Sequence, residues 1–369
     1  MRFRADRRDF LRSAACGALG ASALLRTGSA AGSVIPVVGD GRWIWTAPPE
    51  RERGYLEPRR YRLSVGIELE GIGGAADIIS TTTVPVEYPE QKIESVELET
   101  DGCDATLRTL TPTAGQLLLT ASGIERGQKV IATAHFTLEL FKQYFAWQRD
   151  QFPAKQNVPA QVRGPYLQDS PGIQTSSKQV KQLAAELTSG VEPHPWSYAE
   201  KFADWIPQNI RPQVGPYTSV TTAIDSRRGD CEEMAGVFVA LCRAVQIPAR
   251  LVWVPNHAWA EFFLIDHDDH GHWIPAHTAC YPWFGFTGAH ELVLQKGDRV
   301  YQRERGKTMR LMDDWLRAAG RLPKPRYTAE LTPLPKEPAG DPGPGARKKD
   351  DRGDWKPVGQ HALDKYVRR

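Results

Sequence analysis

Residues 41–150 alternate apolar and polar positions with the period of two that is typical of β-strands. In residues 61–69 the apolar positions are the odd ones, namely Tyr61, Leu63, Val65, Ile67 and Leu69. Residues 129–140 repeat this alternation, and turn sequences such as Asp101-Gly102 separate the runs. Because several short strands follow one another without a helical segment, we expect an all-β sandwich domain over residues 41–150.

The spacing of apolar residues changes after a polar, proline-containing linker at about residues 151–170. Residues 176–190 and 197–206 are predicted to form two amphipathic helices, with apolar faces made of Val180, Leu183, Ala184 and Leu187 and of Ala199, Phe202, Trp205 and Ile206. A third helix should run from Asp230 until Pro248 stops it, and strands should follow. This order predicts an α+β domain over residues 165–322, in which a central helix packs on an antiparallel sheet.

Three consecutive strands are predicted in this domain, at "ARLVWV" (249–254), "NHAWAEFFLI" (256–265) and "HWIPAHTA" (272–279). If the last hairpin closes symmetrically about residue 267, paired positions add up to 534 and His277 lies opposite His257. The loop between these strands contains Asp266, His267, Asp268, Asp269, His270 and His272. We expect it to be a solvated loop and predict no metal site there.

Both ends of the chain differ in composition from the two predicted domains. Residues 323–369 combine frequent Pro and Gly with charge, which predicts an extended or disordered tail. Residues 1–32 place Arg7 and Arg8 before an apolar run and a small-residue cleavage sequence, and resemble a twin-arginine signal peptide. No later segment has the apolar length of a membrane span. We therefore expect a soluble protein that is exported to the periplasm or beyond the cell.

The charges of the chain change this picture little. The 47 Lys and Arg residues and the 44 Asp and Glu residues give a formal net charge of +3 and are mixed along the sequence. A nucleic-acid partner is not expected, because such a partner requires a clustered basic surface. We expect a protein or peptide substrate and no cofactor, while the oligomeric state stays open.

Cys231 stands out because of its position. Asp230 and Glu233 have the spacing of a capping box, so the third helix should begin with Asp230 as N-cap and Cys231 as its first residue. The thiol then lies at the positive end of the helix dipole, near Arg227 and Arg228, and we expect the thiolate to be favoured. Cys242 lies on nearly the same helical face, about 16 Å away, and is expected to be apolar filler.

The segments that contain Cys231, His257 and His277 resemble the three consecutive motifs of the bacterial transglutaminase-like family, over roughly residues 170–290. The resemblance implies a papain-like core in which Cys231 is the nucleophile and His257 the general base. His277 stands where the family usually has Asp. A neutral imidazole there can accept a hydrogen bond from His257 and orient it, although it lacks the charge of a carboxylate.

These observations predict an exported thiol enzyme that acts on a carboxamide or peptide carbonyl through a Cys231 thioester. The backbone N–H of Cys231 is the expected first oxyanion donor, and the sequence reveals no second one. Hydrolysis and transamidation both stay open. The alternative is a catalytically degenerate module with the same fold, which binds envelope protein or peptide.

Overall fold

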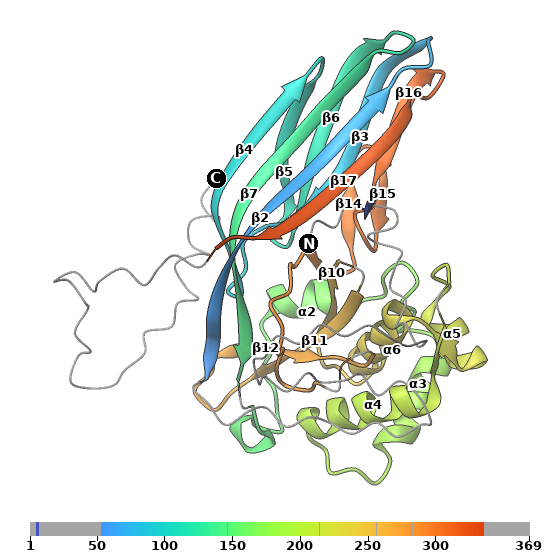
Figure 1. Ribbon diagram of the computed structural model, residues 1–369. Coiled ribbons are helices and arrows are strands. Elements are labelled where there is room, and N and C mark those ends of the chain that lie inside the picture. The colour runs from blue at the N-terminus through green and yellow to red at the C-terminus, as the bar shows by residue number, and fades with distance from the viewer. Residues whose placement is uncertain are drawn as a thin grey trace, which may run out of the picture.

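Two antiparallel β-sheets form the larger part of the structure (Figure 1). The computed structural model describes residues 53–145, 147–213, 215–255, 257–279, 281 and 283–335, and the backbone of residues 5–6. One sheet has the strand order β1-β17-β2-β7-β4. Its strands are β1 (Ala5–Asp6), β17 (Lys324–Pro333), β2 (Gly54–Glu70), β7 (Lys129–Tyr144) and β4 (Gln91–Asp101).

The second sheet has the order β12-β11-β10-β13-β6-β3-β16, and a further strand, β5, pairs with β6. Its strands are β12 (Gly271–Ala276), β11 (His257–Ile265), β10 (Ala249–Val254), β13 (Gln295–Lys296), β6 (Ala114–Ile124), β3 (Ala75–Val84), β16 (Trp315–Gly320) and β5 (Asp104–Thr111). Two short pairs accompany these sheets: β14 (Val300–Gln302) with β15 (Lys307–Met309), and β8 (Arg211–Pro212) with β9 (Arg228–Gly229).

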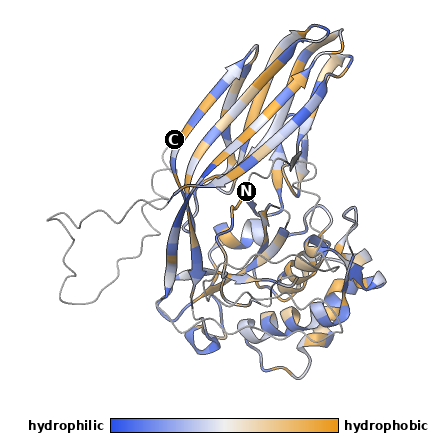
Figure 2. Ribbon diagram, viewed as in Figure 1, coloured by the Kyte–Doolittle hydropathy of each residue, from blue (hydrophilic) through white to orange (hydrophobic). Residues whose placement is uncertain are grey.

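The predicted alternation of β2 and β7 is confirmed, and it builds the core between the two sheets. Leu63 of β2 pairs with Phe136 of β7, and Val65 pairs with Ala134, so apolar residues of neighbouring strands lie on the same face. These side chains are buried together with Leu117 of β6. The apolar and polar bands that alternate along the long strands are visible in Figure 2. Burial of one face and solvation of the other stabilises such a sheet.

Two strands near the C-terminal end of the described chain also belong to this sandwich, so the sandwich is not limited to the predicted residues 41–150. β17 pairs along its whole length with β2, and β16 pairs with β3. The prediction of a disordered tail from residue 323 is therefore wrong for residues 324–333. Prolines obscured a strand whose alternate residues Tyr327 and Ala329 are buried. Residues 336–369 and the predicted signal peptide lie outside the described residues, apart from the two-residue strand β1.

The helices gather at one end of the long strands (Figure 1). The predicted amphipathic helices are confirmed as α3 (Lys178–Thr188) and α4 (Pro195–Asn209), and the third as α6 (Cys231–Ala244). The remaining helices are η1 (Arg149–Gln151), α2 (Ala160–Tyr166) and α5 (Val220–Ser226). Almost every residue of α6 is buried, because α3, α4 and α5 cover it on one side and β10 and β11 on the other. The α+β fold predicted from the sequence is thus confirmed.

A continuous sheet joins the helical part to the sandwich through β13. Gln295 of β13 pairs with Trp253 of β10 and with Ala114 of β6. The neighbouring Lys296 is buried between two carboxylates, with its Nζ 2.5 Å from Glu90 and 2.6 Å from Glu261. Since each buried charge requires its partner, this cluster fixes the two parts against each other.

The strand β11 presents different faces to these two parts. Ala258, Ala260 and Phe262 pack in the core that contains α6. Trp259 packs instead with Tyr88 and other residues of the opposite face. His257, two positions before Trp259, starts this second face.

Among the described helices, even the 15-residue α4 falls short of the apolar length that a membrane span requires.

Candidate active site

Cys231 is the first residue of α6, as the capping box predicts. Asp230 is the N-cap, and its Oδ1 accepts hydrogen bonds from the backbone N–H groups of Glu232 at 2.9 Å and Glu233 at 3.2 Å. Glu233 reciprocates, since its Oε2 accepts from the Asp230 N–H at 2.9 Å. Its Oε1 also accepts from the Thr218 N–H at 2.7 Å, which ties the helix start to the segment before α5. The contacts of Asp230 and Glu233 therefore fix the backbone before and after Cys231.

The thiol of Cys231 is protonated at rest, and the expected preference for thiolate is wrong. Burial raises its pKa to about 12, and the Asp230 carboxylate adds to this, while the backbone of Ala258 opposes it. The expected help from basic residues is missing because they point elsewhere. Arg227 lies over the Trp205 ring at 4.8 Å, and Arg228 donates to Gln213 at 3.1 Å. Desolvation thus outweighs the helix dipole here.

His257 is the first residue of β11, next to Ala258, whose backbone interacts with the Cys231 thiol. Cys231 and His257 therefore both lie near the start of β11, but the His257 ring belongs to the Trp259 face of the strand, and no hydrogen bond joins it to the thiol. Burial lowers the pKa of His257 to about 4, so its imidazole is neutral. Within the described part of the chain, neither ring nitrogen has a hydrogen-bond partner. The resting site therefore contains a neutral thiol and a neutral imidazole, with no ion pair between them.

His277 follows β12 and is fully buried, but its register differs from the predicted one. Paired positions of β11 and β12 add up to 536, as in Ala260 with Ala276. Continuing this register places His277 opposite Trp259, and these rings stack with centroids 4.7 Å apart. His257 lies diagonally from His277, with ring centroids 5.9 Å apart and planes inclined by 20°. The hairpin is centred on residue 268 rather than 267, so the partner of His277 shifts by two positions, and an even shift keeps both histidines on one face.

The predicted hydrogen bond from His257 to His277 does not form. His277 Nε2 lies 3.2 Å from Thr287 Oγ1 instead. Its Nδ1 is buried and has no partner among the residues that the structure describes. Burial and the nearby His257 lower the pKa of His277 well below its ordinary value. His277 thus contributes a neutral stacked ring rather than an acceptor for His257.

Several neighbours of the two histidines were missed in the sequence. Tyr281 stacks on Trp283 at 4.5 Å, and its ring edge meets His257 at 5.7 Å. Thr287, which contacts His277, comes from the segment between β12 and β13, whose described residues form no helix or named strand. A segment without regular secondary structure has no hydrophobic periodicity, so only the side-chain types of these residues could have pointed to the site.

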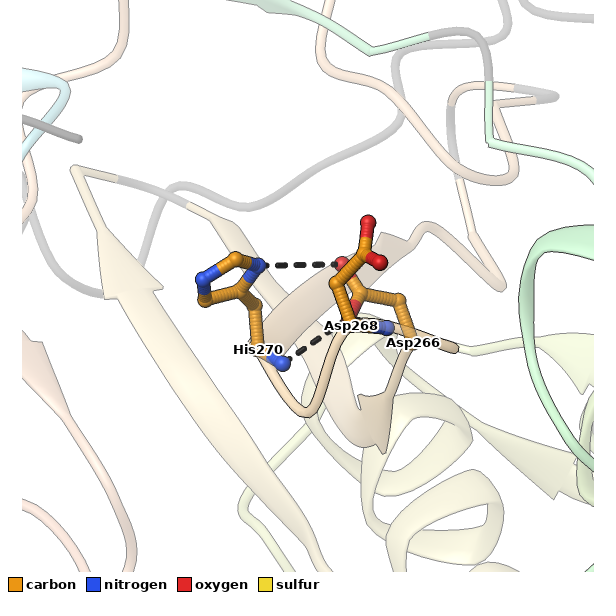
Figure 3. Close-up of side chains that lie close together, drawn as sticks. All are labelled: Asp266, Asp268 and His270. Atoms are coloured by element: carbon orange, nitrogen blue, oxygen red, sulfur yellow. Dashed lines mark hydrogen bonds and ion pairs between the residues drawn. The ribbon is translucent and has the colours of Figure 1, made fainter. Parts of the chain in front are cut away.

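The acidic and histidine-rich loop lies at the opposite end of β11 from His257. Asp266 Oδ1 accepts from the backbone N–H groups of Asp268 at 3.0 Å and His270 at 2.8 Å, as in a tight turn. The potential ligand atoms of these three residues lie within 4.8 Å of one another (Figure 3). Asp266 also pairs with His272 at 2.7 Å. These contacts account for the conformation of the loop.

Comparisons with known proteins bear on the family and the fold of this region. Residues 181–278 match the family model of the transglutaminase-like superfamily. The chain also resembles the solved structure of a putative cysteine protease from Cytophaga hutchinsonii, with a TM-score of 0.54 and 17% sequence identity over 76% of this chain and 93% of that chain. At this identity the likeness shows the fold alone.

A second solved structure, a putative protease from Parabacteroides distasonis ATCC 8503, has a TM-score of 0.24 and 12% identity over 58% of this chain and 63% of that one. A TM-score this low does not indicate a shared fold. The curated proteins contain no match to this sequence. The family match and the shared fold together support the assignment of residues 181–278 to the transglutaminase-like superfamily.

Proposed function

We propose that this protein is an exported thiol enzyme that attacks a carboxamide or peptide carbonyl with Cys231. The observation that carries the proposal is the placement of Cys231 at the capped start of α6. Its thiol lies against the backbone of Ala258, the residue that follows His257 in β11. A nucleophile at a helix start beside a histidine on the packed strand suits acyl transfer through a covalent intermediate.

The reaction needs only these two side chains for its proton transfers. His257 removes the thiol proton as the Cys231 sulfur bonds to the carbonyl carbon, and the carbonyl π electrons move to oxygen. We assign the Cys231 backbone N–H as the oxyanion donor, which is supported by the Asp230 side chain capping the next two N–H groups instead. The imidazolium then protonates the departing amine as the C–N bond breaks. Water or a second amine resolves the thioester, giving hydrolysis or transamidation.

The neutral resting state of the Cys231 thiol and the His257 imidazole determines the kind of catalysis that we propose. A thiolate–imidazolium pair would need a lowered thiol pKa and a raised imidazole pKa, whereas burial shifts both in the opposite directions. We therefore assign His257 as a general base that acts during the attack.

The same observation favours a second candidate function. A neutral Cys231 and a neutral His257, with His277 in place of the usual Asp, are also what a degenerate module that binds envelope protein or peptide would retain. The two candidates differ in whether Cys231 becomes acylated with the help of His257.

Acylation by p-nitrophenyl acetate separates them. The acetyl group is located by peptide mass spectrometry, and its rate of appearance on Cys231 is compared between the wild type and His257→Ala. We expect acetylation of Cys231 in the wild type and a rate at least about 100-fold lower in His257→Ala, because general-base assistance is lost. His135→Ala is the control, since His135 contacts Ser64 in the sandwich. No Cys231 adduct, or equal rates in all three proteins, would favour the binding module.

Export is the other part of the proposal, and it is supported by Arg7 and Arg8 before the apolar run of residues 10–25. Residues 1–32 fused to a reporter that fluoresces when exported in the folded state should direct it out of the cytoplasm. Replacement of both arginines by lysine should retain it inside. Export of the lysine variant at the wild-type level would contradict the twin-arginine assignment.

A further inference from the structure

Arg310 reaches from the sandwich side of the molecule to the first turn of α6. It lies between β15 and β16, and Gln295 of β13 donates a hydrogen bond to its backbone oxygen at 2.8 Å. Its Nε donates to Oε1 of Glu232, and its Nη2 pairs with the same oxygen. Glu232 is the second residue of α6 and directly follows Cys231. A cation from the C-terminal part of the described chain therefore contacts the residue next to the nucleophile.

The guanidinium of Arg310 is also held on its other sides. It lies over the ring of Tyr217, 3.3 Å from the centroid, and its Nη1 donates to the backbone oxygen of Pro171 at 3.3 Å. The Tyr217 hydroxyl donates to the backbone oxygen of Gly172 at 2.8 Å. A Cβ at position 172 would collide with the Tyr217 ring, so glycine permits this close approach. Because a guanidinium stacks on rings and donates in fixed directions, these contacts determine where the positive charge lies.

The sheet provides a second connection between Arg310 and Cys231. The guanidinium carbon of Arg310 lies 6.0 Å from the centroid of the Trp253 ring. Trp253 of β10 pairs with Ala258 of β11, and both residues pack in one core with Cys231. Arg310 is therefore close to the nucleophile through Glu232 along α6 and through Trp253 across the sheet.

A carboxylate next to Cys231 opposes the attack. Negative charge develops on sulfur and on the carbonyl oxygen as the new bond forms, and a neighbouring negative charge raises the energy of that state. Burial raises the pKa of Glu232 to about 7, and Arg310 opposes this rise. The charge of Glu232 in turn is one of the causes that raise the pKa of Cys231. A cation paired with Glu232 reduces this repulsion.

We propose that Arg310 is a positioning residue for Cys231, which holds the Glu232 carboxylate and offsets its charge while negative charge develops on the Cys231 sulfur. Arg310 acts through Glu232 and forms no bond to the substrate. The catalytic use of this contact rests on the proposed function, whereas its effect on the thiol does not require a substrate. The segment between β15 and β16 thereby gives the sandwich side of the molecule a part in the site.

Alkylation of Cys231 by iodoacetamide measures this effect directly. The sulfur bonds to the methylene carbon of the reagent as iodide leaves, and the thiol proton passes to a base. Peptide mass spectrometry distinguishes Cys231 from the half-buried Cys103 and gives the rate at pH 7 and at pH 9.5. Arg310→Met should react at least about fivefold more slowly than the wild type at pH 9.5, because Glu232 is then ionised without its partner.

The variant Arg310→Met/Glu232→Gln separates charge compensation from a purely structural link. Loss of Arg310 moves the pKa of Glu232 above about 7, so the carboxyl is mostly protonated at pH 7 and ionised at pH 9.5. The single and double variants should therefore react at similar rates at pH 7, and the double variant should recover most of the wild-type rate at pH 9.5. Equal rates of the two variants at both pH values would overturn the inference.

Glu232→Gln keeps Arg310 in the chain and tests the inference even if Arg310→Met folds poorly. It should react at least as fast as the wild type at pH 9.5, because the negative charge next to sulfur is lost and the cation stays. A structural link would instead be weakened, so a slower reaction of Glu232→Gln would overturn the inference.

Arg305→Met is the matched control. Arg305 pairs with Asp313 at 2.7 Å and lies over the Trp315 ring at 5.6 Å, so it combines an ion pair and a ring contact as Arg310 does, but its partner precedes β16 instead of lying in α6. Its loss should leave the alkylation rate of Cys231 unchanged at both pH values.

The other titratable groups around the pair stay the same in every variant, so ratios of rates isolate Arg310 and Glu232. These groups are Asp230 and Glu233 on α6, Tyr217 before α5, His257 at the start of β11 and Asp298 after β13.

The acylation experiment with His257→Ala distinguishes failure of this inference from failure of the proposed function. A wild type that acylates with His257 assistance, while Arg310→Met is alkylated at the wild-type rate at pH 9.5, would overturn the role of Arg310 and leave the proposed function standing. The expected alkylation rates without His257-dependent acylation would instead overturn the proposed function and support the effect of Arg310 on the thiol.

Discussion

The imidazole rings of His257 and His277 stack with centroids 5.9 Å apart and planes inclined by 20°, and His277 makes its side-chain hydrogen bond to Thr287. The two histidines therefore share a pocket without forming the linear hydrogen-bonded pair of a catalytic triad. Burial keeps His257 neutral, because an imidazolium loses hydration in such a site.

Cys231→Ser should abolish acylation while the fold is preserved, because a hydroxyl is similar in size but much less acidic than a thiol. Cys242→Ser should behave in the opposite way. Cys242 is fully buried on α6, so a hydroxyl there should cost about 1–3 kcal/mol of stability without a direct effect on chemistry. Acylation kinetics and urea unfolding of both variants check this. Loss of acylation in Cys242→Ser at full stability would contradict the assignment.

His277→Asp should raise the pKa of His257, because a carboxylate beside an imidazole favours the imidazolium. In the wild type the pKa of His257 is about 4, so the base stays neutral and acylation should fall only as the pH drops toward that value. In His277→Asp the acidic limb should move to higher pH by about one unit or more. His277→Asn is the control, since it has the same shape without the charge. Coinciding pH–rate profiles for Asp and Asn would show that position 277 does not act on His257.

Stability should decrease as the pH falls from about 6.5 to about 4, because His257 is buried in its neutral form. Its folded pKa of about 4 lies below the ordinary value of about 6.5, so the unfolded chain binds more protons in this window and is favoured there. The loss from this residue is at most about 3 kcal/mol. Thermal unfolding of the wild type and His257→Gln at pH 7 and pH 4.5 measures it. The variant should lose less stability than the wild type, and an equal or larger loss would contradict burial of a neutral imidazole.

Truncation after residue 335 should leave the melting temperature nearly unchanged, because the composition of residues 336–369 offers little apolar surface to bury. Removal of β17 is different, since Tyr327 is buried and its hydroxyl lies 2.9 Å from Ser80. Tyr327→Ala in the full chain should therefore cost about 3–5 kcal/mol, as for a large buried ring. Differential scanning calorimetry compares both proteins with the wild type. A fall of several degrees after truncation at 335 would show that the tail packs.

The sequence by itself determined the local features of this protein. The period of two identified β2 and β7, the helical period identified α3 and α4, and the capping-box spacing placed Cys231 at the first position of α6. These features depend on residues close in the chain, where backbone geometry allows few arrangements. The order of motifs also indicated the transglutaminase-like fold, which the comparisons support.

Tertiary structure decided what depends on residues distant in sequence. Only the folded chain shows that β17 returns to β2, that β13 joins the two sheets, and that the hairpin register places His277 opposite Trp259. The protonation of Cys231 and His257 belongs here too. The helix dipole and nearby arginines are readable in sequence, but the desolvation that outweighs them arises from the packing of segments far apart in the chain. Burial is a property of the whole fold, so these two pKa shifts cannot be read from the sequence.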